Sequence, residues 1–354
     1  MNNTAYIERS ILDSAQAQEI LARARPSNIV EIDRYGEVFN PKAQNFRLQK
    51  LNPALIIAEK HGKFVLPTPE GYGIGGSNNY YFSHMMNCIY DCRYCFLQGM
   101  YQSANHVVFA NYDAFFNEIS HVSQRHENES VWFFSGYDCD SLALEPVTRF
   151  MSHCLDYFSP SQEQPNPAYG NAPANAHLEI RTKSTQIRDL LKRKPLINCV
   201  IAYSLSPQPI VAEIEHKTPS LGKRIDALKK LQQQGWPIGL RFDPLIAAKN
   251  FEQLYADMFD EVFDNLDMGN IHSISLGTFR LPKPFFKKII KLYPEEPMLA
   301  VSLDQSSSDA SAGNSKSRQT MVSYPQPLEQ DMMSFCSDRI LSAVDASRFF
   351  PCHT

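Results

Sequence analysis

Three cysteines stand close together in the first third of the chain. They are Cys88, Cys92 and Cys95, with the spacing C-x3-C-x2-C. Three thiolates can ligate three irons of a 4Fe–4S cluster, which leaves the fourth iron without a protein ligand. An open iron can bind the amino and carboxylate groups of S-adenosylmethionine (SAM) and pass it an electron, whereas a fourth cysteine would close the cluster. The alternative is a zinc site with a distant fourth ligand.

The composition limits the remaining classes of protein. Eight cysteines in 354 residues are too few for a disulfide scaffold. The net charge of −4 excludes a uniformly basic nucleic-acid binder but leaves room for a local basic groove. No apolar run approaches the roughly 20 residues of a membrane helix, and the N-terminus lacks the pattern of a signal peptide. We therefore expect a cytoplasmic protein with no membrane partner.

The elements that must position the cysteines follow a regular rhythm from residue 79 onward. Short β-prone runs alternate with amphipathic helical patterns, which predicts right-handed crossovers and a parallel sheet. Six such units predict an α/β fold with a partial (β/α)6 barrel rather than the complete eight-unit barrel. The expected strands are Tyr80–Phe82, Val131–Phe134, Leu178–Arg181, Val200–Ser204, Ile238–Phe242 and Ile271–Leu276. The expected helices between them are Tyr112–Arg125, Glu145–Phe158, Thr185–Lys194, Leu221–Gln234 and Phe251–Leu266, and a separate amphipathic helix is expected around Ser14–Ala24 in the N-terminal region.

The domain organisation expected from these patterns has three parts. A small N-terminal region covers residues 1–75, the partial barrel covers 76–300, and a C-terminal extension covers 301–354. Two stretches within this plan resemble mobile insertions because their composition cannot bury much apolar surface. They are Ser159–His177, rich in Pro, Asn and Ala, and Gln305–Arg318, rich in Ser.

Several motifs extend the pattern of the cysteines. On the basis of these motifs, the sequence resembles the radical SAM superfamily and, within it, the spore photoproduct lyase family, over roughly residues 6–300. The matching segments are Cys92–Gln98 (CRYCFLQ), Leu178–Lys183 (LEIRTK), Tyr203-Ser204, Glu215–Thr218 with Lys223–Ile225, and Thr278–Arg280 followed by Pro282. The resemblance implies a radical SAM barrel in which the cysteine loop follows the first strand.

The resemblance also implies roles for particular residues. Cys88, Cys92 and Cys95 would ligate the cluster, and Tyr94 would line the adenine side of SAM. Lys183 and Ser204 would hold the methionyl carboxylate and its surroundings. A lysine at the carboxyl end of a barrel strand is chemically suited to that role, because its ammonium is a point charge for an anion. The plainer alternatives are an exposed lysine and a serine that bonds the backbone.

The activity implied by the family is DNA repair. One electron from the cluster would cleave SAM to methionine and a 5′-deoxyadenosyl radical, which would abstract hydrogen from a methylene-bridged thymine dimer and allow C–C scission. The implied partners are lesion-containing DNA and an electron donor such as flavodoxin or ferredoxin. The alternatives are a radical SAM enzyme with a different substrate and a non-catalytic iron–sulfur or nucleic-acid-binding module.

The resemblance weakens at the residue that would donate a hydrogen atom to the product radical. The family uses a cysteine near the end of the second strand, and an ungapped alignment through Ser141–Thr148 places Tyr137 there. Cys139 lies two residues later and would share a face with Tyr137 in an extended strand. Cys139 is therefore one candidate donor, or a small buried filler, and Tyr137 is the other. Phe96 replaces a tyrosine that the family is proposed to use as a relay, and Phe has no O–H.

Basic residues gather in two places despite the acidic net charge. Basic side chains interleaved with aromatic rings suit a phosphate track, although a solvated helix face with core aromatics gives the same pattern. The C-terminal segment lacks the dense basic and aromatic run that the family inserts into DNA, so the DNA substrate carries over less well than the fold and cofactor. The first group is Arg181, Lys183, Arg188, Lys192, Arg193 and Lys194; the second is Arg280, Lys283, Lys287, Lys288 and Lys291, with Phe279, Phe285 and Phe286 between them.

Overall fold

The structure is a computed structural model that describes residues 3–39, 44–69, 71–126, 128–159, 169–300, 303–307 and 320–352. The chain divides into two compact units. Unit 1 comprises Met1–Pro67, Ser77–Ile89 and Met100–Ile180, and unit 2 comprises Thr68–Gly76, Tyr90–Gly99 and Arg181–Thr354. Residues 160–168 and 308–319 lie outside the described residues; they include 9 of the 19 residues of the first predicted insertion and 11 of the 14 residues of the second. The three-part division into 1–75, 76–300 and 301–354 stays a prediction.

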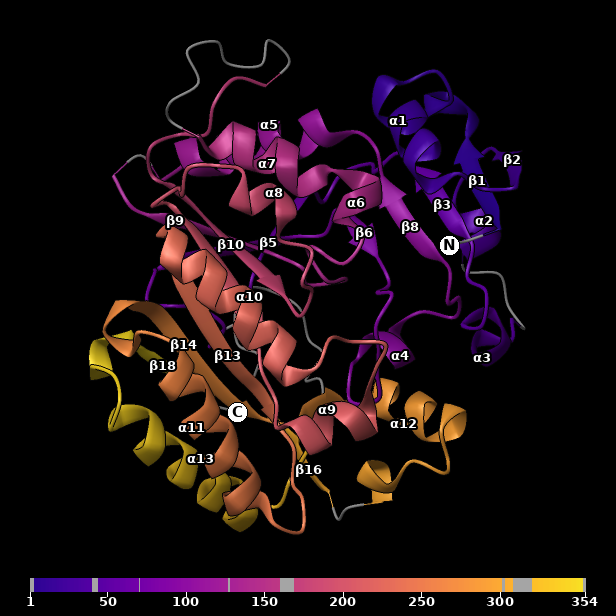
Figure 1. The fold of residues 1–354 in the computed structure, drawn as a ribbon. Helices are drawn as coiled ribbons and strands as arrows, with labels where there is room; N and C mark the ends of the chain where they lie inside the picture. The colour runs from indigo at the N-terminus through magenta and orange to yellow at the C-terminus, as the bar shows by residue number, and fades with distance from the viewer. Residues whose placement is uncertain are drawn as a thin grey trace. The chain divides into compact units, whose positions relative to one another are not determined.

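Unit 1 contains the first strands of the predicted barrel. β5 (Asn78–Phe82) pairs in parallel with β9 (Val131–Ser135), and β9 pairs in parallel with β10 (Ala176–Thr182). β4 (Val65–Pro67) adds an antiparallel edge to β5. The helices α5 (Tyr112–Gln124) and α7 (Phe150–Phe158) lie side by side in this unit (Figure 1). Aromatic side chains fill the core between them, among which Phe115, Phe116, Phe133 and Phe150 are fully buried.

A second sheet in unit 1 was not predicted. It has five strands in the order β2-β1-β3-β8-β6. Helix α1 (Ala15–Ala24) connects the parallel strands β1 and β2, and the hydroxyl of Ser14 accepts a hydrogen bond from the backbone N–H of Ala17 at its start. The strands are β1 (Thr4–Glu8), β2 (Asn28–Ile32), β3 (Leu55–Ala58), β6 (Met85–Met86) and β8 (His106–Phe109).

Unit 2 contains the remaining parallel strands. β11 (Cys199–Ser204), β13 (Ile238–Leu245), β14 (Ile271–Thr278) and β18 (Phe349–Pro351) pair in that order, each parallel to the next. Three long helices lie along these strands (Figure 1). They are α10 (Leu221–Gln234), α11 (Phe251–Asn265) and α13 (Gln326–Leu341).

Short elements complete unit 2. β7 (Asp91–Cys92) pairs antiparallel with β12 (Glu215–His216), directly after helix α9 (Gln208–Ile214). Helix α12 (Lys283–Leu292) follows β15 (Arg280–Pro282). β15 and β16 (Asp304–Ser307) flank β17 (Thr320–Ser323) in an antiparallel sheet. Further short helices are α4 (Leu97–Met100) and α8 (Arg188–Leu191).

The predicted elements agree with the structure in most places. Each of the six expected strands is present, and α10 has the expected bounds with Gly235 at φ 99° as its C-cap. The helix expected over Glu145–Phe158 is split into α6 (Glu145–Thr148) and α7, because Arg149 adopts a left-handed φ of 57°. The helix expected over Thr185–Lys194 is reduced to one turn. In the described part of the chain, no helix has both the length and the hydropathy needed to cross a membrane.

Candidate active site

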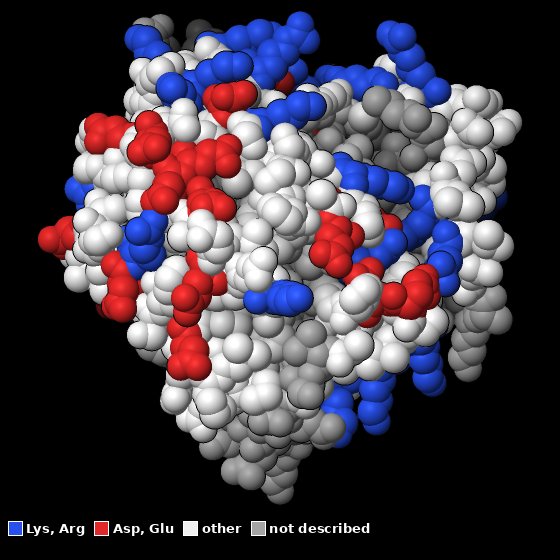
Figure 2. All heavy atoms as spheres, turned by 60° about the horizontal axis from the view of Figure 1, so that its bottom comes forward, with Lys and Arg blue, Asp and Glu red and all other residues white. Residues whose placement is uncertain are grey.

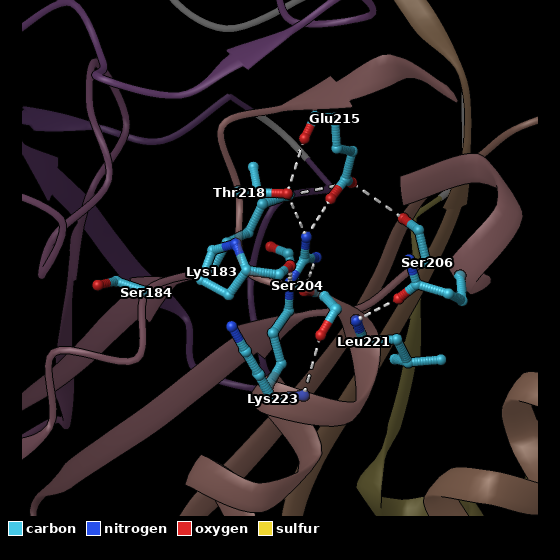
Figure 3. Close-up of polar contacts among 12 residues, drawn as sticks. Lys183, Ser184, Ser204, Ser206, Glu215, Thr218, Leu221 and Lys223 are labelled. Atoms are coloured by element: carbon cyan, nitrogen blue, oxygen red, sulfur yellow. Dashed lines mark hydrogen bonds and ion pairs between the residues drawn. The ribbon is translucent and has the colours of Figure 1, made fainter. Parts of the chain in front are cut away.

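Glu215 is the centre of a buried polar network in unit 2. Its backbone lies in β12, opposite Cys92 of β7. The phenol of Tyr94 donates a hydrogen bond to Oε1 of Glu215, and the hydroxyl of Ser206 donates another to the same oxygen at 3.2 Å. Figure 3 shows Ser206 and Thr218 joined to Glu215 by hydrogen bonds. Tyr94 and Ser206 thus hold the carboxylate, while Thr218 donates to the backbone carbonyl of Glu215.

Lys183 approaches the same carboxylate from the residue after β10. Its Nζ lies 3.9 Å from Oε1 of Glu215 and 5.7 Å from the centroid of the Tyr94 ring. The side chain of Lys183 is only 14% exposed. The alternative of an ordinary exposed lysine therefore does not apply, because this side chain is largely buried and its ammonium lies near a carboxylate and an aromatic ring.

Arg224 supplies the second cation. Its Nη2 pairs with Oε2 of Glu215, and both side chains are 0% exposed. Three further donors bond the carbonyl of Ser204 at 3.0 Å, the carbonyl of Pro219 at 2.9 Å and the hydroxyl of Thr218 at 2.8 Å. A buried ion pair is stable only when its other hydrogen-bonding groups find partners, and these bonds supply partners for most of this guanidinium.

The protonation states in this network follow from burial and charge. Burial raises the pKa of Glu215, but Lys183 and Arg224 together outweigh burial and hold the pKa below its ordinary value. Burial and the neighbouring Glu215 raise the pKa of Tyr94 well above its ordinary value. At neutral pH the site therefore has one carboxylate, one neutral phenol and two cations. This excess of positive charge suits an anionic ligand.

The structure brings together three of the residues predicted to hold SAM. Tyr94, Lys183 and Ser204 all contact the pair formed by Glu215 and Arg224, either directly or through the Ser204 carbonyl. Ser204 is buried at the carboxyl end of β11. Glu215 and Arg224 lie within one of the family motifs, but no role was predicted for either of them. Their sequence neighbours give no signal, because the segment between them, HKTPSLGK, is itself polar and basic.

Two of the predicted cluster ligands lie in one tight segment of unit 2. Residues Tyr90–Gly99, called the cysteine loop below, contain Cys92 and Cys95, and the N–H of Cys95 donates to the carbonyl of Cys92 at 3.1 Å. The amide of Gln98 also donates to that carbonyl, at 3.2 Å. Cys88 belongs to unit 1 and is half-buried.

The side chains available as metal ligands fit the predicted iron–sulfur cluster by their chemistry. Within the described ranges, no group of three or more His, Cys, Asp or Glu side chains converges as a metal site. The donors themselves fit an iron–sulfur cluster, because three thiols with two of them on a single turn are the soft ligands that iron–sulfur clusters use. The roles of Cys88, Cys92 and Cys95 stay a prediction.

Tyr137 and Cys139 lie in different surroundings. β9 ends at Ser135, and Gly136 has a φ of 80°, so residues 137–139 form a bend rather than an extended strand. The expectation that the two side chains share one strand face is therefore wrong. Tyr137 is 36% exposed and stacks on Tyr81 with ring centroids 4.1 Å apart, whereas Cys139 is 6% exposed. Cys88 is among the groups that raise the pKa of the Cys139 thiol, after burial itself.

Several buried polar groups in unit 1 lie near Cys139 and were not singled out together from the sequence. The Nζ of Lys60 donates to the carbonyl of Ser83 at 3.3 Å, and both Asp138 and Cys139 act electrostatically on this ammonium. Tyr101 is close enough to Asp138 and Cys139 that both raise its pKa, after the larger effect of burial. His84 is 1% exposed and stacks on Phe150 at 4.2 Å, and burial lowers its pKa to about 3. Lys60, Asp138 and Tyr101 are the polar groups of this set that interact with the candidate thiol.

The fold and the cysteine motif together define the class of this protein. The full chain superposes on a cysteine-to-serine mutant of spore photoproduct lyase with a TM-score of 0.79 at 15% identity, over 100% of this chain and 98% of that one. A second solved mutant, with bound AdoMet and dinucleoside spore photoproduct, gives a TM-score of 0.78 at 16% identity, over 100% of this chain and 98% of that one. The fold is the partial barrel of radical SAM enzymes, as predicted.

Sequence comparison identifies the family. The family model described as "Spore photoproduct lyase" matches residues 74–349. A spore photoproduct lyase of Bacillus subtilis (strain 168) is 23% identical over 298 residues, 82% of either chain. One of Geobacillus sp. (strain Y412MC61) is 22% identical over 223 residues, 62% of this chain and 61% of that one. This chain belongs to the spore photoproduct lyase family of radical SAM enzymes.

Proposed function

We propose that this protein repairs a methylene-bridged thymine dimer in DNA, with a 4Fe–4S cluster on Cys88, Cys92 and Cys95 and with SAM as co-substrate. The observation that carries the proposal is the C-x3-C-x2-C motif in a chain of which residues 74–349 match the spore photoproduct lyase family. The bound cluster supplies one electron for the reductive cleavage of SAM. The physiological source of that electron is an electron carrier of the flavodoxin or ferredoxin class.

The residues around Glu215 would bind and orient SAM. The ammonium of Lys183 supplies a charge-assisted contact for the methionyl carboxylate. The Tyr94 ring, fixed by the hydrogen bond from its hydroxyl to Glu215, supplies a flat apolar surface for adenine. Ser204 presents a hydroxyl at the carboxyl end of β11, and its carbonyl is fixed by Arg224. Glu215 and Arg224 are positioning residues in this proposal, because they hold the contacting side chains in place.

Cys139 is the favoured hydrogen donor. A thiol gives up a hydrogen atom more readily than a phenol does, and Cys139 is shielded from solvent while Tyr137 is partly exposed. Shielding matters because a carbon-centred radical in contact with water and solutes undergoes side reactions. Asp138, Tyr101 and Lys60 lie close enough to this thiol to interact with it electrostatically.

The decisive experiment is anaerobic incubation of reconstituted protein with dithionite, SAM and dimer-containing DNA, followed by analysis of thymine and 5′-deoxyadenosine. We expect about four irons per chain, as one 4Fe–4S cluster requires. Alanine at Cys88, Cys92 and Cys95 should abolish iron binding, whereas the control Cys199→Ala, at a fully buried cysteine in β11, should not. Full iron content in the triple variant would refute the cluster assignment. SAM cleavage without any product from dimer DNA would refute the substrate and retain the radical SAM chemistry.

A further inference from the structure

Helix α12 carries a concentrated positive charge on its exposed side. Its sequence, KPFFKKIIKL, contains four lysines and no acidic residue. Lys287, Lys288 and Lys291 are exposed. Between them Ile290 is 38% exposed, a large apolar side chain on an otherwise charged face. This combination leaves both charge and apolar surface available on one short helix.

The same helix is in direct contact with the cysteine loop. A Cβ at Gly99 would lie 2.5 Å from the carbonyl oxygen of Phe285, so only glycine permits this approach. The hydroxyl of Tyr293, just after α12, donates to Oε1 of Gln98 at 3.1 Å. The guanidinium of Arg93 lies 3.9 Å from the centroid of the Tyr293 ring. Arg93 immediately follows Cys92, so the backbone of a predicted cluster ligand is one residue from this contact.

Unit 2 has the opposite charge on another helix. All the charged residues of α11 are acidic, and none of its positions is Lys or Arg. Figure 2 shows a group of acidic side chains on the left and projecting Lys and Arg side chains on the right, with a smaller number of acidic side chains among them. The exposed acidic residues of α11 are Glu252, Asp257, Asp260, Glu261 and Asp264.

We propose that the exposed face of α12 docks a small acidic one-electron carrier protein that reduces the cluster. The carrier would be repelled by α11 and attracted by α12, which steers it toward the cysteine loop. In the docked complex the carrier loses one electron and the cluster gains one, and no bond forms or breaks. This inference rests on the proposed function, because it assigns a surface to the reductant of that site.

The alternative occupant of a lysine-rich helix is DNA, and two observations favour the protein carrier. First, Ile290 adds an exposed apolar side chain among the lysines, which can be buried in a protein interface, whereas a phosphate backbone gains nothing from it. Second, α12 contacts the one segment of unit 2 that must receive an electron. Small, salt-sensitive interfaces are typical of electron-transfer partners.

The test compares two matched charge reversals in the full-length protein. Lys287→Glu/Lys288→Glu changes two adjacent exposed lysines on α12, and Lys229→Glu/Lys230→Glu changes two on α10 as the control. Binding of an oxidised acidic flavodoxin, measured by calorimetry at low salt, needs no cluster turnover. We expect the α12 variant to bind about tenfold or more weakly than wild type, and the α10 variant to bind as wild type does.

Two further measurements separate the possible outcomes. Reduction of the reconstituted cluster by reduced flavodoxin should slow in the α12 variant, while reduction by dithionite should not change. Unchanged flavodoxin binding would overturn the proposal. A loss of affinity for duplex DNA with unchanged flavodoxin binding would also overturn it and assign α12 to nucleic acid. If dithionite fails to reduce any cluster in the wild type, the proposed function itself is wrong, and the calorimetric result still stands.

Discussion

Replacement of Glu215 by glutamine removes the only carboxylate that contacts both Lys183 and Arg224 among the described residues. The change keeps the size of the side chain and one carbonyl oxygen, so packing is nearly unaltered. It leaves two cations without their counter-charge, one of them 0% exposed. Breaking a buried ion pair from one side costs about 3–5 kcal/mol, because the remaining charge is buried without compensation. We expect Glu215→Gln to lower the free energy of unfolding by about 3 kcal/mol.

The measurement is urea denaturation of the apoprotein, compared with a matched exposed pair. Arg339 and Asp260 also form an Arg–carboxylate contact, but their side chains are 38% and 63% exposed. Asp260→Asn should therefore cost about 1 kcal/mol or less. The double variant Glu215→Gln/Arg224→Met should recover part of the loss, because it removes the charge that Glu215→Gln leaves uncompensated. A cost for Glu215→Gln no larger than that of Asp260→Asn would refute the reasoning.

The stability of the Glu215→Gln variant should also depend on pH differently from that of the wild type. The folded state lowers the pKa of Glu215 from its ordinary value of 4.5. The unfolded chain therefore takes up this proton first as the pH falls, and the stabilisation present above pH 4.5 is lost through the folded pKa below it. Glu215→Gln cannot titrate, so its stability should depend less on pH in that acidic range than the stability of the wild type does.

Three other predictions concern single side chains. Lys183→Ala should weaken SAM binding by about ten- to a hundredfold, or roughly 1.5–3 kcal/mol, with the cluster intact; unchanged affinity in calorimetry would contradict its assigned role. His84→Phe should keep the stack on Phe150 and reduce acid destabilisation between pH 6.5 and about 3, where the unfolded chain binds a proton that the folded state excludes, at about 1.4 kcal/mol per pH unit. Identical stability–pH curves would disprove the burial argument. Cys139→Ala should leave SAM cleavage intact and divert the product radical into side products, whereas Tyr137→Phe should still yield clean thymine; the reverse result would make Tyr137 the donor.

The barrel strands were predictable because their sequences carry a local signal. Val131–Ser135 and Cys199–Ser204 are buried at every position, and such continuous apolar runs are typical of parallel strands covered on both faces. In the second sheet, β3 carries the same signal, with LIIA buried at every position, but β2 lacks it. β2 is exposed at four of its five positions, including Ile29 and Val30, so neither an apolar run nor a clean alternation marks it. Its pairing with β1 depends on a long-range register that composition does not encode.

The candidate site likewise contains some residues that short sequence motifs identify and others that only long-range contacts identify. Tyr94, Lys183 and Ser204 were found because each lies in a short motif of the family. The role of Glu215 could not be found from its neighbours in sequence, because a buried glutamate and a surface glutamate have the same letter. It becomes visible only when Tyr94, 121 positions away, donates a hydrogen bond to it.

The pairing of β7 with β12 connects the backbone of the cysteine loop to that of Glu215. Cys92 and Glu215 are partners in one short ladder, and Arg93 adds a further backbone hydrogen bond, from its N–H to the carbonyl of Ile214 at 2.9 Å. A cluster on Cys92 and SAM beside Lys183 would then be positioned by the same pair of strands. The SAM contacts would not depend on a separate loop that must close, because the side chains of Lys183 and Tyr94 both contact Glu215. Electron transfer into SAM needs a fixed distance between donor and acceptor, and a hydrogen-bonded ladder with a buried ion pair at its end holds that distance more firmly than side-chain packing alone.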